Sequence, residues 1–367
     1  MIQLKDLCQK ASSNIAQKDL EGHEGQYPIY GASGLIGYVD FYKQENPYVA
    51  VVKDGAGIGR VMCLPEKSSV IGTMQYILPN EGVNVHYLAF AMEHMNLAKY
   101  FSGATIPHIY FKDYGKEKLL ERTEKEQKSI AEILSKMDSL ISLRKQQLAK
   151  LDELVKARFV EMFGNPIENT MNWPKKLLRD ITTKIGSGAT PKGGRESYPN
   201  AGVSLIRSMN VYDGQFLYKD LAHLTDEQAT QLNGVTVEAE DVLVNITGAS
   251  VARSCVVPKD VLPARVNQHV AIVRCNRELL NPIFTNKMFI NNEFKKALLS
   301  IGESGGATRQ AITKKQLEEL SVVVPPLSIQ NEFFTFSECV DQQKQTVQQS
   351  LDKLELMKKA LMQEYFG

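Results

Sequence analysis

The sequence predicts an α+β protein, in which two mixed α/β domains are separated by two long helices that form an antiparallel coiled coil with a pseudo-two-fold repeat. Two observations lead to this prediction. The second half of the 367-residue chain repeats the first, and each half ends in a long segment that has an apolar stripe and no glycine or proline. We expect a first domain at 1–115, a central long helix at 116–164, a second domain at 165–325 and a C-terminal long helix at 326–367.

The repeat is clearest at a separation of 203 residues. At this offset Ala104-Thr105 matches Ala307-Thr308, and Phe163-Gly164 matches Phe366-Gly367, with no gap between the two matches. Further upstream the match continues at a different offset, where Gly55 and Arg60 correspond to Gly248 and Arg253, and Gln75 corresponds to Gln268. The second copy is longer, mostly between about 187 and 235. The two copies therefore share a scaffold but not all of their loops.

The long helices are predicted at 126–162 and at 328–366. Thr123 and Glu126 form a capping-box pattern before the first helix, and Pro325-Pro326 precedes the second. Apolar residues recur in each helix at alternating spacings of three and four, which is typical of a coiled-coil seam. The residues predicted to pack along the two seams are Ile130, Leu134, Met137, Ile141, Leu148, Leu151, Val155, Phe333, Val340, Val347, Leu351, Leu354 and Leu361.

Neither helix is apolar all round, so each needs a partner for its stripe. The stripe alone leaves open whether two chains associate or two helices of one chain pair. The repeat favours pairing within one chain, because the segment between the helices is long enough to bring the second helix back antiparallel.

The globular segments contain short β-type runs followed by a helical spacing in each copy. We expect strands at 48–52, 69–71, 75–78, 241–244 and 269–273, and helices at 86–100 and 283–299. Glycine-rich turns separate these runs. The turn Gly55-Ala56-Gly57-Ile58-Gly59 has neither the dinucleotide-binding spacing nor a P-loop lysine, so a tight loop is favoured over a nucleotide site.

No motif for catalysis or metal binding is present, so we predict no catalytic residues and no metal-binding residues. The five cysteines are scattered and are expected to be reduced, mostly buried thiols, which favours a cytoplasmic location. Asn281-Pro282-Ile283-Phe284 lacks the second proline of an adenine-methyltransferase motif and is predicted to start a helix. No apolar run reaches the ~20 residues that a membrane helix needs.

The chain resembles the specificity subunits of type I restriction–modification enzymes over nearly its whole length. The resemblance rests on the order domain, helix, domain, helix and on four motifs, which are Tyr27-Pro28-Ile29-Tyr30-Gly31-Ala32-Ser33-Gly34, Ser102-Gly103-Ala104-Thr105-Ile106-Pro107, Leu148-x-x-Leu151 and Pro325-Pro326-Leu327-x-x-Gln330. One departure is the first domain, which is short beside the second. The resemblance implies that this domain is a compact recognition domain of another subtype.

The resemblance implies a non-catalytic subunit with two target-recognition domains that together read an asymmetric, bipartite DNA site. Its implied partners are double-stranded DNA, two methyltransferase subunits that dock on the helices, and restriction subunits bound through them. No cofactor is expected in this chain, and S-adenosylmethionine is expected in the methyltransferase subunit. The 43 basic and 42 acidic residues nearly cancel, so a DNA surface must be local or shared with a partner.

Base readout needs arginine, lysine, asparagine or glutamine in loops that reach base edges. The candidate DNA-binding residues are Lys53, Arg60, Arg207, Asn210, Asn245, Arg253, Arg309 and Gln310. Gln75 and Gln268 recur in both copies, which favours a role in the scaffold, since two readers of different sequences should differ at their contacts. The alternative to DNA recognition is a coiled-coil protein-interaction scaffold without DNA readout.

Overall fold

A computed structural model describes residues 1–55, 57–102, 107–191, 198–303 and 310–367. The chain divides into two compact units. The first unit contains Met1–Gln147 and Val347–Gly367, and the second contains Leu148–Thr346. Each unit therefore holds one globular domain together with part of each long helix.

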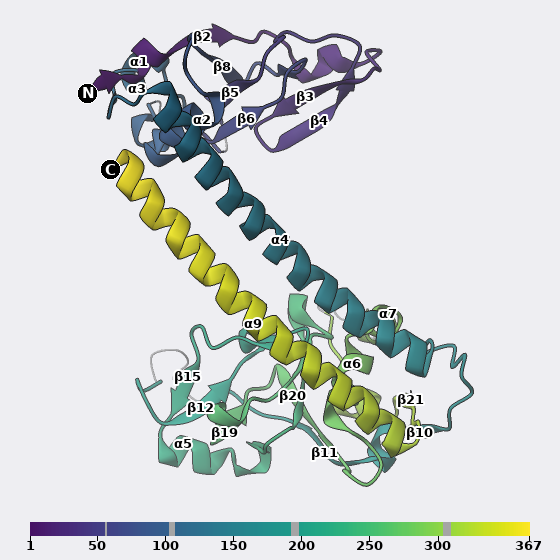
Figure 1. Cartoon of the computed structure of the whole chain (residues 1–367). Coiled ribbons are helices and arrows are strands. Elements are labelled where there is room, and N and C mark those ends of the chain that lie inside the picture. Colours follow the sequence, from purple (N-terminus) through teal and green to yellow (C-terminus); the bar gives the residue numbers. More distant parts are fainter. Residues whose placement is uncertain (56, 103–106, 192–197, 304–309) are drawn as a thin grey trace. The chain divides into compact units, whose positions relative to one another are not determined.

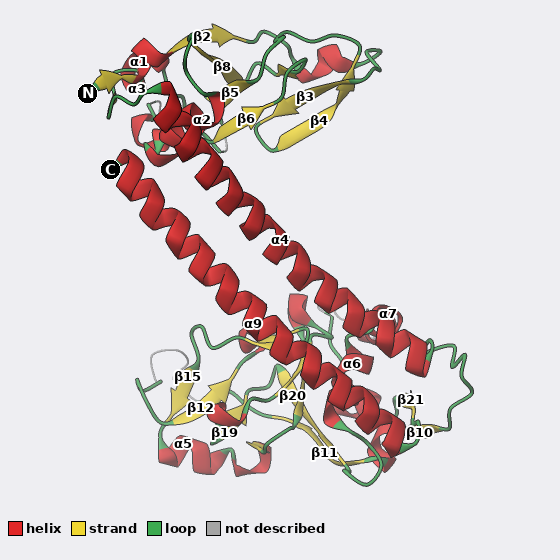
Figure 2. Ribbon diagram, viewed as in Figure 1, coloured by secondary structure: helices red, strands yellow, loops and turns green. Residues whose placement is uncertain are grey.

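The first unit is built on a four-stranded antiparallel sheet with the order β2-β8-β5-β6 (Figure 2). The strand bounds are β2 Cys8–Ser12, β5 Tyr48–Val52, β6 Val61–Leu64 and β8 Met74–Pro79. Every residue of β5 is buried, as its continuous apolar run predicts. Helix α2 (Val85–His94) packs with one face of this sheet, and its Leu88, Ala91 and Met92 join Val49 and Val51 in one apolar core.

A smaller sheet, β4-β3-β7, completes the first domain, with β3 antiparallel to β4 and parallel to β7. A separate strand pair, β1-β9, lies beside α1, and α3 precedes β9 in the chain. The bounds are β1 Ile2–Gln3, α1 Leu4–Leu7, β3 Tyr27–Gly31, β4 Gly34–Val39, β7 Ser69–Val70, α3 Phe111–Tyr114 and β9 Lys118–Leu119. Because β9 pairs with β1, the first domain extends beyond the predicted boundary at residue 115.

The second unit repeats this topology. Its main sheet, β11-β20-β17-β18, has the same order and pairing as β2-β8-β5-β6, and its second sheet again contains a parallel pair, β12 with β19. The strand bounds are β10 Lys175–Leu177, β11 Thr182–Ser187, β12 Val203–Ile206, β15 Ala222–Leu224, β16 Thr236–Val237, β17 Val242–Asn245, β18 Ser254–Val256, β19 Ala264–Val266, β20 Val270–Cys275 and β21 Ser321–Val323.

Insertions account for the greater length of the second domain. The hairpin β13-β14, the helix α5 and the strand β16 have no counterpart among the described elements of the first domain. The bounds of the hairpin and of the helices of this domain are β13 Val211–Tyr212, β14 Gln215–Phe216, α5 Asp226–Gln231, α6 Pro282–Phe289, α7 Asn292–Glu303 and α8 Lys314–Glu318.

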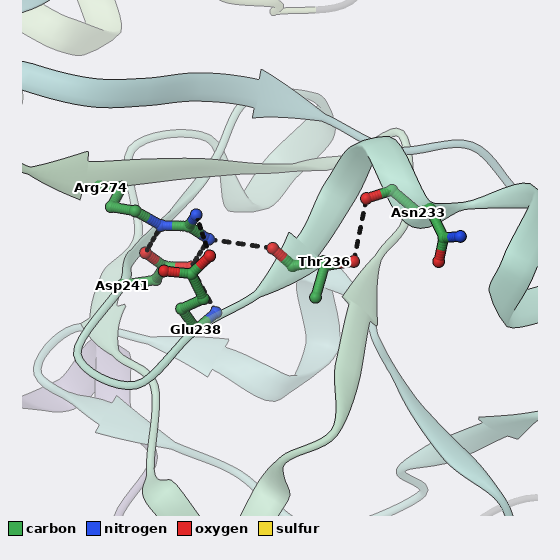
Figure 3. Close-up of polar contacts among 5 residues, drawn as sticks. All are labelled: Asn233, Thr236, Glu238, Asp241 and Arg274. Carbon is green, nitrogen blue, oxygen red and sulfur yellow. Dashed lines mark hydrogen bonds and ion pairs between the residues drawn. The ribbon is translucent and has the colours of Figure 1, made fainter.

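An arginine cluster ties β20 to the start of β17 and to β16 in the second domain (Figure 3). The Arg274 guanidinium donates to both carboxylate oxygens of Asp241, at 2.8 and 2.9 Å, and to the Thr236 carbonyl at 3.0 Å. Glu238 pairs with the same guanidinium. Asp241 is only 1% exposed, so this bidentate pair neutralises a carboxylate that burial would otherwise destabilise.

The pairing of the strands shows which residues of the two domains are equivalent, and it changes the predicted partner of Gln75. Val51 of β5 lies opposite Gln75, whereas the equivalent Val244 of β17 lies opposite Ala271. Gln268 precedes β20 in the chain, so the predicted equivalence of Gln75 and Gln268 is wrong. Gln75 is indeed part of the scaffold, because its side chain is buried and accepts a hydrogen bond from the Tyr114 hydroxyl at 2.7 Å.

Both predicted domain helices are shorter than expected. The helix expected at 86–100 ends at His94, because Asn96 adopts a left-handed φ of 50° and a 3₁₀ turn follows. The helix expected at 283–299 is divided into α6 and α7. Its predicted start is confirmed, since Asn281 caps α6 through the amides of Ile283 and Phe284 and Pro282 occupies the first turn.

The long helices are α4 (Glu124–Phe163) and α9 (Leu327–Phe366), close to the predicted bounds (Figure 1). The predicted capping box is present, with the Thr123 amide donating to the Glu126 carboxylate at 2.8 Å and the Glu126 amide donating to the Thr123 hydroxyl at 3.3 Å. The central helix thus starts at 124, and the residues from 116 to 123 that we assigned to it belong to the domain end and the cap.

The two helices run antiparallel within each unit. In the first unit Lys358 pairs with Asp138 and Lys145 pairs with Glu355, both at 2.8 Å. In the second unit Lys344 pairs with Asp152 at 2.5 Å and Arg158 pairs with Glu332 at 3.1 Å. In both units the higher number on α4 faces the lower number on α9, which is the order that antiparallel helices require.

The predicted packing residues are largely buried. Ten of them are at most 9% exposed, namely Ile130, Leu134, Met137, Ile141, Leu151, Val155, Phe333, Val340, Val347 and Leu351. Leu148, Leu354 and Leu361 are half-buried. Two further packing residues that the spacing of the stripe did not predict are Phe159 and Phe163, which pack against Phe333 and Phe284 in the second unit.

A buried glutamine attaches each long helix to its domain. Gln127 accepts the Asn84 amide at 3.0 Å and donates to the Arg122 carbonyl at 3.0 Å. In the second copy Gln330 accepts the Asn281 amide at 2.9 Å and donates to the Pro325 carbonyl at 2.7 Å. Each glutamine thereby joins the first turn of a long helix to the residue that caps α2 or α6.

We predict that Gln330→Met destabilises the second domain by about 1–3 kcal/mol, because the Asn281 amide and the Pro325 carbonyl lose their partner in the interior. Gln127→Met should have a similar effect on the first domain. Urea unfolding followed by circular dichroism measures the change. The matched control is Gln343→Met, at an exposed position of α9. A Gln330 variant as stable as the Gln343 variant would contradict the anchoring role.

Candidate nucleic-acid interface

The turn after β5 and the turn after β17 are closed by the same backbone hydrogen bond. In the first domain the Gly59 amide donates to the Val52 carbonyl at 2.8 Å, and in the second the Ala252 amide donates to the Asn245 carbonyl at 2.9 Å. Gly55 and Gly248 open these turns with φ values of 80° and 77°, a left-handed conformation that favours glycine. Arg60 and Arg253 therefore occupy equivalent scaffold positions, as the repeat predicts.

Each turn is also bound to the segment that precedes a short helix of its own domain, which is α3 in the first domain and α8 in the second. The Gly55 amide donates to the Pro107 carbonyl at 3.2 Å, and the Gly248 amide donates to the Gln310 carbonyl at 3.0 Å. The predicted reader Gln310 is half-buried, and its side chain donates to Glu303 at 2.7 Å. The predicted reader Arg309 lies outside the described residues.

Arg60 borders a groove of about 570 Å³ in the first domain. Its guanidinium is exposed and donates to the Ala32 carbonyl at 2.6 Å. Gln17, Ser33 and Thr73 also line the groove, so the structure brings together several groups that can donate or accept hydrogen bonds. Gln17 and Ser33 were not predicted, because only the fold brings the loops that carry them next to Arg60.

Lys53, the other predicted reader in the first domain, is less exposed than Arg60 and lies near an acidic side chain. Its Nζ lies 3.7 Å from the Asp54 carboxylate, and its side chain is 22% exposed. Asp54 also pairs with His108, whose ring lies 4.2 Å from that of Tyr110. Basic, acidic and aromatic side chains therefore lie together at this turn, and the negative charge of Asp54 offsets the positive charge of Lys53.

Arg207 and Arg253 of the second domain both lie over tyrosine rings. Arg207 is 5.9 Å from the Tyr198 ring centroid and donates to the Asp220 carbonyl. Arg253 is 4.2 Å from the Tyr212 ring centroid, within the range of a strong cation–π contact. Both rings were missed in the sequence, because nothing in the local pattern pairs them with these arginines.

Two predicted readers, Asn210 and Asn245, are wrong, because both side chains are 0% exposed. Asn210 accepts the Arg207 amide at 3.0 Å and donates to the Leu217 carbonyl at 2.8 Å. Asn245 donates to the Ser208 and Val211 carbonyls at 2.9 and 3.3 Å. Their amides hold the loop around β13 and cannot reach a base edge from the interior.

The described residues hold no group of three histidine, cysteine or acidic side chains that could bind a metal ion. Cys8, Cys255 and Cys275 are buried as expected, Cys63 is half-buried, and Cys339 is exposed, contrary to that expectation. Burial raises the pKa of Cys255 to about 12 and that of Cys275 to about 11, so both remain thiols at neutral pH. In the described part of the chain no helix is long and apolar enough to cross a membrane.

Comparison with known proteins agrees with this repeated architecture. Residues 1–153 and 171–356 match the family described as type I restriction modification DNA specificity domain. The chain belongs to this family. The predicted kinship is confirmed, as is the predicted fold of two repeated mixed α/β domains, and the two matched segments coincide with the two copies of the repeat.

Two relatives come from Methanocaldococcus jannaschii. A putative type I restriction enzyme MjaX specificity subunit is 23% identical, and the match covers 98% of this chain and 91% of the relative. The type I restriction enzyme MjaVIII specificity subunit is 20% identical, with 98% and 89% covered. The chain therefore spans almost the full length of these members of the specificity family.

Two solved structures share the fold. The S subunit of a type I restriction–modification system from M. genitalium aligns with a TM-score of 0.65 at 15% identity, over 100% of this chain and 95% of that subunit. A chain from a type I system whose complex assembly and conformational transition have been described aligns with a TM-score of 0.54 at 13% identity, over 99% and 96%. At these identities the likeness concerns the fold alone.

We predict that Asn210→Ala destabilises the second domain by about 2 kcal/mol, because the Arg207 amide and the Leu217 carbonyl lose their buried partner. Hydrogen exchange should show faster exchange of the amides from 211 to 216. The control is Asn200→Ala, at an exposed position of the same domain. If Asn210→Ala weakens DNA binding while exchange and stability stay at the control level, Asn210 is a reader after all.

Proposed function

We propose that the chain recognises an asymmetric, bipartite DNA site, with each globular domain reading one half-site. The observation that carries this proposal is the pair of equivalent turns bearing Arg60 and Arg253, placed on one scaffold but surrounded by different groups. A shared scaffold supports a shared task, and different surroundings support different target bases. This is the division expected between positioning contacts and base readout.

The asymmetry of the two domains supports unlike half-sites. In the first domain Arg60 borders an open groove, whereas in the second an inserted hairpin supplies a tyrosine beside Arg253. Two identical readers related by two-fold symmetry would favour a palindromic site. Two readers that differ in length and in contacts favour an asymmetric one.

The proposed partners are double-stranded DNA, two methyltransferase subunits that dock on the long helices, and restriction subunits bound through the methyltransferases. Exposed apolar side chains on the helices of the first unit support protein docking, since apolar side chains that gather on one surface are typical of interaction sites. These side chains are Ile133, Leu140, Leu143, Leu356 and Met357. We expect this chain to be non-catalytic, with S-adenosylmethionine bound by the methyltransferase subunit.

A coiled-coil protein scaffold without DNA readout is not favoured, because the family that matches both copies is one of DNA specificity domains. The two functions differ in a simple measurement. Affinity for duplex DNA should fall steeply with rising salt, since phosphate contacts release counterions. A scaffold without DNA readout would show no such binding, alone or with methyltransferase subunits.

We predict that the chain alone transfers no methyl group, and that the complex with methyltransferase subunits methylates adenine in a two-part asymmetric motif. Single-molecule sequencing of a methylation-free host that expresses the complex identifies the motif. The control is a host with the methyltransferase alone. Methyl transfer by the purified chain would contradict the non-catalytic role, and a palindromic motif would contradict unlike half-sites.

We predict that the long helices set the distance between the half-sites. Insertion of four residues after Gln147 in α4 and after Thr346 in α9, at the boundary of the two units, lengthens each helix by about 6 Å. The methylated motif should gain about one or two base pairs between unchanged half-sites, since one turn of ~34 Å holds about ten base pairs.

The control for this change is the same four residues inserted after Glu168, in a turn outside the helices. That insertion should leave the motif unchanged. If the paired helix insertions also leave the spacing unchanged in an active complex, the helices serve only for docking.

A further inference from the structure

We infer that Arg253 reads a base of the second half-site, and that Tyr212 of the inserted hairpin is the positioning residue that orients it. This inference rests on the proposed function and names the side chains that carry it out in one domain. It also assigns a role to the hairpin Val211–Phe216, which has no counterpart among the described residues of the first domain.

The Arg253 side chain packs against an aromatic ring, and its N–H groups have no acceptor among the described residues. It is half-buried, and its guanidinium carbon lies 4.2 Å from the centroid of the Tyr212 ring, which is 39% exposed. Within the described ranges of the chain its guanidinium makes no hydrogen bond or ion pair. A ring packed against a guanidinium restricts the arginine side chain and leaves N–H groups available for an acceptor.

The hairpin that carries Tyr212 is anchored on both sides. The Gly214 amide donates to the Ser254 carbonyl at 2.8 Å, next to Arg253 in the chain, and Phe216 is buried in the core of the domain. Asn245 holds the Ser208 and Val211 carbonyls from below, and Lys295 pairs with Asp213 at the hairpin tip. A tyrosine on so fixed a support restricts the stacked arginine before DNA binds, which lowers the entropy lost on binding.

The first domain shows the same arginine without this support. Val52 takes the place of Asn245 in the central strand, and no hairpin is inserted there among the described residues. Arg60 instead donates to the Ala32 carbonyl, and its guanidinium lies over Gly57. One scaffold position therefore carries an arginine in both domains, and the neighbouring loop decides how that arginine is oriented.

A base is favoured over a phosphate as the acceptor. Arginine reads guanine through two parallel hydrogen bonds to O6 and N7, a contact that requires a fixed guanidinium plane. A phosphate can also bind arginine through two hydrogen bonds, but a phosphate contact carries no sequence information. The equivalent arginines of the two domains have different surroundings, which favours base readout over a phosphate contact common to both domains.

The test uses the chain in complex with its methyltransferase subunits, expressed in a methylation-free host. The variants are Arg253→Ala, Tyr212→Ala and Tyr212→Phe, with Arg60→Ala as the matched variant at the equivalent position of the first domain. Sequencing of methylated adenines identifies the motif of each variant. Binding of the complexes to duplexes with single-base changes gives the discrimination at each position, and circular dichroism checks the folded state.

We expect Arg253→Ala to lower discrimination about tenfold to a hundredfold at one position of one half-site and to leave the other half-site unchanged. Tyr212→Ala should weaken discrimination at the same position. Tyr212→Phe should retain the discrimination, because phenylalanine keeps the aromatic ring beside Arg253. A merely structural defect would not be confined to one base position. Arg60→Ala should affect the opposite half-site.

Three results would overturn the inference while the proposed function stands. The first is an equal loss of affinity for all duplexes with Arg253→Ala, which indicates a phosphate contact. The second is a motif and an affinity that Arg253→Ala leaves unchanged. The third is an effect of Arg253→Ala and Arg60→Ala on the same half-site. If the unaltered complex shows no sequence preference at all, the proposed function fails together with the inference.

Discussion

A glutamine side chain in the first turn of each long helix joins that helix to its globular domain. Gln127 and Gln330 each bridge a backbone amide at the cap of a domain helix and a carbonyl just before the long helix. Both glutamines are buried, and a buried polar side chain without a partner is costly. The first turn of each long helix is therefore held to its domain by the same contact in both copies.

Each unit places a lysine near the repeated aspartate of its long helix, but a different helix supplies that lysine in each unit. In the first unit Lys358 of α9 lies over the Phe90 ring and pairs with Asp138 of α4. In the second unit the position equivalent to Phe90 is Lys287 of α6, which faces Asp341, the repeat equivalent of Asp138, and burial lowers the pKa of this lysine. A cation near the repeated aspartate is kept in both units, although a different element supplies it.

The second domain uses buried polar groups to hold an insertion. Asn210 and Asn245 would be unfavourable in a purely apolar core, and the side-chain nitrogen of each donates to carbonyls of the loop that carries β13. The insertion in turn brings Tyr212 to Arg253. The side chains that distinguish the domains thus form a chain of contacts, from an asparagine in the central strand to an arginine at the surface.

The repeat, the long helices with their stripes, the capping box and the central strands are evident in the sequence, because each depends on local spacing or on a match between the two copies. The burial of Asn210 and Asn245 and the stacking of Arg253 on Tyr212 are not. An asparagine after an apolar run has the same local pattern whether its amide faces a solvent-exposed groove or the carbonyls of an inserted loop. Only the tertiary structure decides between them. Asn245 and Arg253 find their partners in the inserted segment, which lies about 30 or more residues away along the chain, and Asn210 is buried although its own partners are close in sequence.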